Sequence, residues 1–223
     1  MENSAIKFSQ RKIKKNYRSI TGHFPSIKNN TSIGFESKLE KAHFLSLEFD
    51  NEVISYQEQP QVEICINGKD KIYSADCYIK RTKNSNKKDS IVEVKYTNEI
   101  EKRKDYFEKK FEAAKTSVNK LNLDFEVYTE KIHSEIYLDN LDFLYRYKLQ
   151  PIENKYEDQI LATIINKNNK ISAFDLANLI SKNPIEYGLI SNCIWDLVCK
   201  EKLKTNLELS KITMNSLVEL SYE

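Results

Sequence analysis

Hydrophobic and polar residues alternate in two stretches of the chain, which predicts two β-strands. In residues 72–79 the alternation places Asp76 on one face of its strand. In residues 90–96 it places Glu93 and Lys95 on one face and turns the valines on either side of Glu93 into the core. An acidic residue in one strand and an acidic-x-Lys triplet in the next can therefore meet at one edge of a sheet.

Longer segments have apolar residues at helical spacing. Residues 34–49, 98–121 and 134–149 each predict a helix, and the alternation in residues 123–129 predicts a further strand. The order of helix, strands, helix and strand predicts an α/β (α+β) fold, in which a mixed sheet is flanked by helices. Pro151 marks the end of this unit, so the first expected domain is residues 1–150.

The rest of the chain, residues 151–223, is expected to form a small second domain. Helical spacing and strand-like runs follow one another in it, over residues 156–165, 172–180, 185–200, 203–209 and 211–214. Three helices followed by a hairpin predict a winged-helix-like domain, with Ser172 as a helix cap. A DNA-reading third helix would carry Arg or Lys, whereas this one offers Lys200 against Glu186 and Asp196, so we interpret the domain as protein-binding. Trp195 is more typical of a core residue than of an interface anchor.

Composition limits the classes of protein that the chain can belong to. It carries 35 basic and 33 acidic residues, so no overall basic field indicates nucleic acid. Neither an apolar run of 18 residues nor a signal-like apolar segment is present, so we expect a cytoplasmic protein that does not contact a membrane. The four cysteines form no C-x-x-C pair and are expected to be reduced core thiols. The histidines have no metal-ligand spacing, although His43 lies one helical turn from Glu40 and is a candidate neighbour of the site.

Basic charge is concentrated in two segments that are candidates for phosphate contact. Residues 1–30 carry seven Lys or Arg and one acid, and a polar, flexible loop is expected over residues 80–89. A solvated, disordered terminus is the alternative interpretation of the first segment. The candidate DNA-binding residues are Arg11, Lys12, Lys14, Lys15 and Arg18 in the arm, and Lys80, Arg81, Lys83, Lys87 and Lys88 in the loop.

The paired acids suit the chemistry of a metal-dependent nuclease. Mg²⁺ prefers oxygen ligands, which Asp76, Glu93 and the carbonyl of Val94 can supply. Such an ion stabilises the developing charge on a phosphodiester and activates a water molecule. Lys95 could orient that water, accept its proton or balance charge, and the sequence does not rank these roles. An ordinary solvated pattern of cross-strand charges is the alternative.

A third acid lies on the predicted helix of residues 34–49. Glu40 could project from this helix toward the metal. Periodicity alone favours the other interpretation, in which Glu36 and Glu40 are solvated charges flanking Lys38 and Lys41.

Short motifs in residues 17–130 resemble, in order, the TnsA endonuclease family. They are Thr21-Gly22-His23-Phe24-Pro25-Ser26, Phe35-Glu36-Ser37-Lys38-Leu39-Glu40, Phe44-Leu45-Ser46-Leu47-Glu48-Phe49-Asp50, Val53-Ile54-Ser55-Tyr56, Glu58-Gln59-Pro60, Ala75-Asp76 and Val92-Glu93-Val94-Lys95. The members of this family are nuclease subunits of heteromeric cut-and-paste transposases. One departure is Ala75, where the wider superfamily often has proline, a position that shapes the strand and does not bind metal.

The resemblance implies a fold, a site and partners. It implies a restriction-endonuclease-like fold, a winged-helix C-terminal domain, and catalytic roles for Glu40, Asp76 and Lys95, with Glu93 at a position that is glutamine in some members. It implies a Mg²⁺-dependent cut, with Mn²⁺ as a substitute, in the 5′ strands of double-stranded DNA at transposon ends. The implied partners are a TnsB-like transposase and a TnsC-like ATPase regulator. A stand-alone restriction or repair nuclease and a catalytically silent DNA-end binding scaffold are the alternatives.

Overall fold

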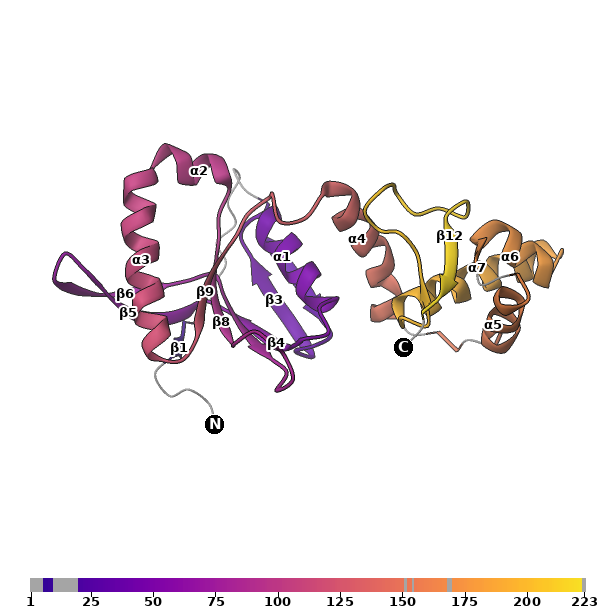
Figure 1. Ribbon diagram of the computed structural model, residues 1–223, viewed down its shortest axis with the longest axis horizontal. Coiled ribbons are helices and arrows are strands. Elements are labelled where there is room, and N and C mark those ends of the chain that lie inside the picture. Colours follow the sequence, from indigo (N-terminus) through magenta and orange to yellow (C-terminus); the bar gives the residue numbers. More distant parts are fainter. Residues whose placement is uncertain (1–5, 10–19, 151, 154, 168–169, 222–223) are drawn as a thin grey trace. The chain divides into compact units, whose positions relative to one another are not determined.

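The computed structural model of the chain describes residues 6–9, 20–150, 152–153, 155–167 and 170–221. The chain divides into two compact units, Met1–His133 and Ser134–Glu223 (Figure 1). This division falls earlier than the boundary expected at residue 150, because helix α4 (Glu135–Leu149) packs against α7 (Pro184–Cys199) in the second unit. None of the helices among the described residues has the length and apolar character needed to cross a membrane.

A four-stranded mixed sheet forms the centre of the first unit. Its strands are β4 (Val53–Glu58), β7 (Cys77–Arg81), β8 (Ser90–Val94) and β9 (Asp124–Tyr128), in the order β4-β7-β8-β9. The β8–β9 pair is parallel and the other two pairs are antiparallel. All five residues of β8 are buried, as expected of a central strand that is covered on both faces.

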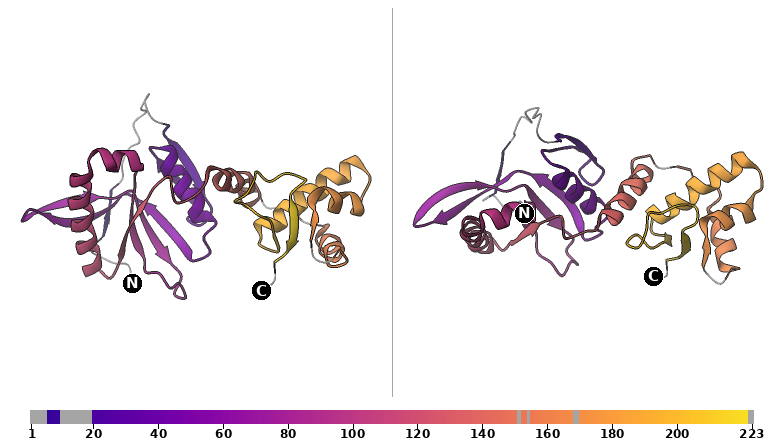
Figure 2. Two further views of the ribbon diagram at one scale, coloured as in Figure 1. Left: turned by 45° about the horizontal axis from the view of Figure 1, so that its top comes forward. Right: turned by 90° about the horizontal axis from the view of Figure 1, so that it is seen from above.

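Helices α1 (Lys38–Glu48) and α3 (Lys104–Lys120) cover opposite faces of this sheet (Figures 1 and 2). On β9, Phe125 packs on Phe111 of α3 and Tyr128 packs on His43 of α1, with ring centroids 5.6 and 4.5 Å apart. Residues three apart on a strand point to opposite faces, so the two helices lie on different sides. The predicted mixed sheet flanked by helices is confirmed, and it is consistent with a restriction-endonuclease-like fold.

Two smaller sheets complete the first unit. One contains β1 (Lys7–Phe8), β5 (Pro60–Ile66) and β6 (Lys69–Ser74), and the other pairs β2 (Gly22–Ser26) with β3 (Thr31–Phe35). The hairpin of β5 and β6 turns at Asn67 and Gly68, both of which have positive φ as such a turn requires.

Two helix boundaries differ from the sequence prediction. The helix expected from residue 34 begins at Lys38, because Gly34 and Phe35 pair with β2 and the side chain of Ser37 caps the helix. The helix expected over residues 98–121 is two helices, α2 (Thr97–Lys102) and α3, because the backbone of Arg103 leaves the helical region at φ −131° and ψ 38°.

The second unit contains the three helices predicted after residue 151. They are α5 (Glu157–Ile165), α6 (Ala173–Ile180) and α7, and the side chain of Ser172 caps α6 as predicted. Strands β10 (Lys170–Ser172), β11 (Leu203–Lys204) and β12 (Leu217–Leu220) form one antiparallel sheet. The prediction of a strand at residues 211–214 is wrong, since β12 is the partner of β11. The winged-helix interpretation stays a prediction.

Buried side chains test two smaller expectations. Trp195 is 4% exposed and packs edge to face on Phe143 of α4, so its assignment to the core is confirmed. Cys77, Cys193 and Cys199 are buried, but Cys65 is exposed on the β5–β6 hairpin, and the expectation of a core thiol is wrong there.

Candidate active site

Asp76 lies where the chain passes from one sheet to another. The residue before it, Ala75, donates its N–H to Pro60 of β5, whereas Asp76 donates its own to the carbonyl of Val92 in β8. The carbonyl of Asp76 accepts from the N–H of Gln59, which has a positive φ of 55°. The carboxylate accepts from the N–H of Val94 at 2.7 Å. Asp76 is therefore held at the junction between two strands, and not in the middle of one as its alternation with apolar neighbours suggested.

Glu93 is fixed from two directions in the interior of the first unit. It lies on β8 with its residue 3% exposed. Its Oε2 accepts a 2.5 Å hydrogen bond from the hydroxyl of Tyr73 on β6, and its Oε1 lies 3.0 Å from the ammonium of Lys110 on α3. Buried carboxylates are costly unless they are paired in this way.

Glu40 caps the helix on which it lies. Its Oε1 accepts from the hydroxyl of Ser37 at 2.9 Å, and its Oε2 accepts from the N–H of Glu36 at 2.9 Å. Ser37 in turn accepts from the N–H of Glu40, which completes a capping box at the N-terminus of α1. The structure therefore gives the Glu-Ser-x-x-Glu motif a structural role, which the solvated alternative did not include.

Electrostatic effects show that the four predicted catalytic residues lie close together. Burial, then the neighbouring Glu93 and Glu40 carboxylates, raise the pKa of Asp76 to about 7, while Lys95 opposes this rise. Burial also raises the pKa of Glu40, and Lys95 lowers it. Two carboxylates and one ammonium group thus act on Asp76, and the site has an excess of negative charge that a cation would relieve.

The donor atoms of the site fit a hard divalent cation. Nowhere in the described part of the chain do three or more His, Cys, Asp or Glu side chains form a group that could hold a metal ion. Mg²⁺ is usually bound through one or two carboxylates, with waters and substrate oxygens as its other ligands. Asp76 and Glu93, with the carbonyl of Val94, offer such a set of oxygens, although Tyr73 and Lys110 already contact the two oxygens of Glu93. The carboxylate of Glu40 is engaged in the helix cap. Metal ligation by these residues stays a prediction.

Of the candidate phosphate contacts, the structure describes only those of the loop after β7, and these do not lie beside Asp76. Arg11, Lys12, Lys14, Lys15 and Arg18 lie outside the described residues. Lys80, Lys83, Lys87 and Lys88 are exposed. Lys80 lies on β7, four extended residues or about 13 Å along the chain from Asp76, and Lys83, Lys87 and Lys88 lie in the loop that follows β7.

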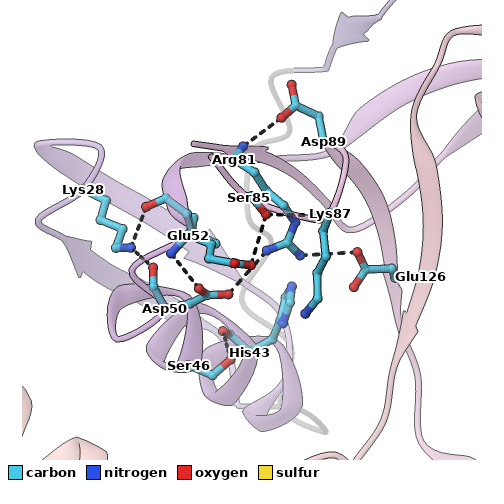
Figure 3. A network of polar contacts seen from close by, with 11 residues as sticks. Lys28, His43, Ser46, Asp50, Glu52, Arg81, Ser85, Lys87, Asp89 and Glu126 are labelled. Carbon is cyan, nitrogen blue, oxygen red and sulfur yellow. Dashed lines mark hydrogen bonds and ion pairs between the residues drawn. The ribbon is translucent and has the colours of Figure 1, made fainter. Parts of the chain in front are cut away.

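Arg81 corrects the expectation of an exposed loop cation. Its side chain is 4% exposed, and its guanidinium lies 3.4 Å from Asp50 and 3.3 Å from Glu126 (Figure 3). The loop itself is held in place, since Arg81 donates its N–H to Asp89 and Ser85 donates its hydroxyl to Glu52. Arg81 is therefore part of the internal structure and is not available for phosphate.

His43 lies in the same region, between α1 and the sheet. It is 4% exposed, and neither ring nitrogen has a hydrogen-bond partner among the described residues. Burial, followed by the positive charges of His133 and Arg81, lowers its pKa to about 3. A neutral imidazole against the ring of Tyr128 packs like an apolar side chain, so the geometry gives no support to His43 as a neighbour of the metal site.

Sequence reasoning missed two residues of the site, Tyr73 and Lys110. Tyr73 lies in the alternating run before Asp76, and its phase marks it only as buried. Lys110 is one of five lysines on α3, and its residue type does not separate it from the solvated ones. The available signal was its place within the stripe of Phe107, Ala114 and Val118, where a lysine requires a buried partner.

Comparison with known proteins bears on this geometry. Residues 50–130 match the family model described as TnsA-like endonuclease N terminal, and this stretch includes Asp76, Glu93 and Lys95. A search of curated proteins found no significant match. The resemblance to the TnsA endonuclease family is thus confirmed over the matched stretch, which ends close to the end of the first unit.

Proposed function

From the TnsA-like endonuclease domain of residues 50–130, we propose that this chain is the Mg²⁺-dependent DNA endonuclease subunit of a heteromeric transposase. In this proposal it cuts the 5′ strands at transposon ends, while a TnsB-like transposase cuts the 3′ strands under a TnsC-like ATPase regulator. The observation that carries the proposal is the position of Asp76, whose N–H and carboxylate both bond to the β8 backbone that bears Glu93, and on which the charges of Glu93, Glu40 and Lys95 act.

The residues take distinct roles in this reaction. Asp76 and Glu93, with the carbonyl of Val94, would hold Mg²⁺, or Mn²⁺ in its place, and Glu40 would join them if it leaves its cap. The bound ion supplies charge stabilisation for the phosphodiester and activation of the attacking water. Lys95 is held by its own N–H, which donates to the carbonyl of Tyr128 at 2.9 Å, so its ammonium is directed from a fixed backbone. It would orient the water, take its proton or balance the charge of the phosphate.

We propose further that cutting depends on the partner proteins. Helix α7 carries no Arg or Lys between Pro184 and Cys199, and Arg81 is buried, so the described residues offer little equipment for reading a DNA sequence. The acidic and apolar second unit suits a protein partner better than DNA. A nuclease that must cut only assembled ends is safer when its complex gates it.

A nicking assay on DNA that contains transposon ends tests the proposal, with Mg²⁺ and with or without the partner proteins. The wild-type chain should nick the 5′ strands only when the partners are present, and Asp76→Ala and Lys95→Ala should abolish nicking while they leave the fold and partner binding intact. Efficient, sequence-specific cutting by the chain alone would favour a stand-alone nuclease. Full activity of both variants would favour a silent scaffold.

A further inference from the structure

Lys110 is a cation in direct contact with the proposed nuclease site that belongs to none of the motifs. Its ammonium lies 3.0 Å from Oε1 of Glu93, and its side chain is 17% exposed. It also lies 4.5 Å from the centre of the Tyr73 ring and 5.8 Å from that of Phe107. Two aromatic faces and a carboxylate therefore hold the ammonium in one place.

The contact changes what Glu93 can do. One carboxylate oxygen receives the hydroxyl of Tyr73 and the other receives Lys110, so both oxygens are already engaged. Lys110 is paired with one of the two acids that would bind a divalent cation, so its charge offsets part of the attraction of Glu93 for that cation. The net pull of Glu93 on a cation is thereby reduced.

We propose that Lys110 is a positioning residue and the resident counter-ion of Glu93. It fixes the orientation of the Glu93 carboxylate and weakens the affinity of the Asp76–Glu93 site for a divalent cation. This inference rests on the proposed function, since it concerns the cation of that same site. A merely structural lysine would leave cation affinity unchanged or would lower it on removal, whereas a counter-ion that competes with the metal raises the affinity when it is removed.

Calorimetric titration of the full chain with Mn²⁺ alone tests the proposal. Lys110→Met should lower the dissociation constant for Mn²⁺ at least fivefold, and Lys110→Arg should bind like the wild type. Lys109→Met is the matched control, because it removes the same charge from an exposed neighbouring position of α3 and should leave the constant within twofold. Lys110→Gln retains a hydrogen-bond donor for Glu93 without the charge, so it should also lower the dissociation constant for Mn²⁺. It replaces Lys110→Met in the test if that variant fails to fold.

The outcomes separate the two proposals. If the wild type binds Mn²⁺ and neither Lys110→Met nor Lys110→Gln binds it more tightly than Lys109→Met, the counter-ion inference is wrong and the nuclease proposal stands. If the wild type and Asp76→Ala take up Mn²⁺ equally, or neither binds it, the metal site itself is wrong and the inference is overturned with it.

Discussion

The carboxylate of Asp76 is bound to the backbone of Val94, whose N–H donates to it at 2.7 Å. The carboxylate of Asp76 is thus oriented by the main chain of β8, and no neighbouring side chain is needed to hold it. An amide side chain can accept the same hydrogen bond, so the position can lose its charge without losing its place.

Asp76→Asn is expected to stabilise the metal-free protein while it abolishes nicking. Asp76 is half-buried, and its removal from water, followed by the charge of Glu93, raises its pKa to about 7. Removal of one of these charges should raise the melting temperature by about 2–6 °C, which corresponds to 1–2 kcal/mol for a chain of this size. Thermal melts with and without Mg²⁺ measure this. Asp70→Asn, at an exposed position of β6, should change neither the melting temperature nor nicking. A lower melting temperature for Asp76→Asn would show that the charge of Asp76 does not destabilise the metal-free protein.

Two variants should distinguish the capping role of Glu40 from its proposed catalytic role. Glu40→Gln keeps one oxygen that can accept from the N–H of Glu36, and its NH₂ can donate to the hydroxyl of Ser37, so we expect a loss of stability smaller than that of Ser37→Ala and strongly reduced nicking. Ser37→Ala removes the cap and should cost about 1 kcal/mol while some activity remains. Urea unfolding and the partner-dependent nicking assay measure the two effects. If Glu40→Gln nicks like the wild type, Glu40 is only a cap.

Arg81 should behave as a structural residue. Arg81→Met leaves Asp50 and Glu126 without their shared cation and should cost about 2 kcal/mol of folding free energy, moderated by the partial exposure of both acids. Lys83→Ala, in the neighbouring loop, should stay within about 0.5 kcal/mol of the wild type. Equal stability of the two variants in urea would show that the buried ion pairs contribute little.

His43 should make the first unit sensitive to acid. Its folded pKa of about 3 lies below the usual 6.5, so its contribution to stability is complete above pH 6.5 and is lost as the pH falls toward 3. The loss should approach ~1.4 kcal/mol per pH unit in this range. His43→Phe should flatten the dependence between pH 7 and pH 5, and His23→Phe, at an exposed position, should not. Far-UV circular dichroism is the suitable probe, because Trp195 lies in the second unit and its fluorescence would miss the transition.

The sequence predicted the elements of the fold better than their ends. Alternation placed Glu93 correctly on a buried strand, because a buried face imposes a period of two, whereas Asp76 lies between two strands and not within one. The division of the 98–121 helix at Arg103 could not be predicted, since its cause is local backbone geometry that apolar spacing does not record. The assignment of α4 to the second unit depends on packing with α7, which is a long-range contact.

The site was predictable only where its residues belong to a motif. Glu40 was named from the resemblance, and its cap explains why a serine lies three residues before it. Arg81 was misassigned because a basic residue beside a lysine-rich loop has the same composition whether it is solvated or paired with Asp50 and Glu126. Long-range partners of this kind have no signature in a single sequence.

The passage of the chain from β6 to β7 at Asp76 has a mechanical consequence. The residues on either side of this junction belong to different sheets, so Asp76 lies at the point where the two sheets are joined. If a bound duplex or a docked protein tilts one sheet against the other, Asp76 moves relative to Glu93 and Lys95 even though neither side chain is contacted. In the proposed nuclease, the distances from Asp76 to Glu93 and Lys95 would thus depend on the angle between the two sheets. Assembly with the partner proteins could act on the reaction by changing that angle.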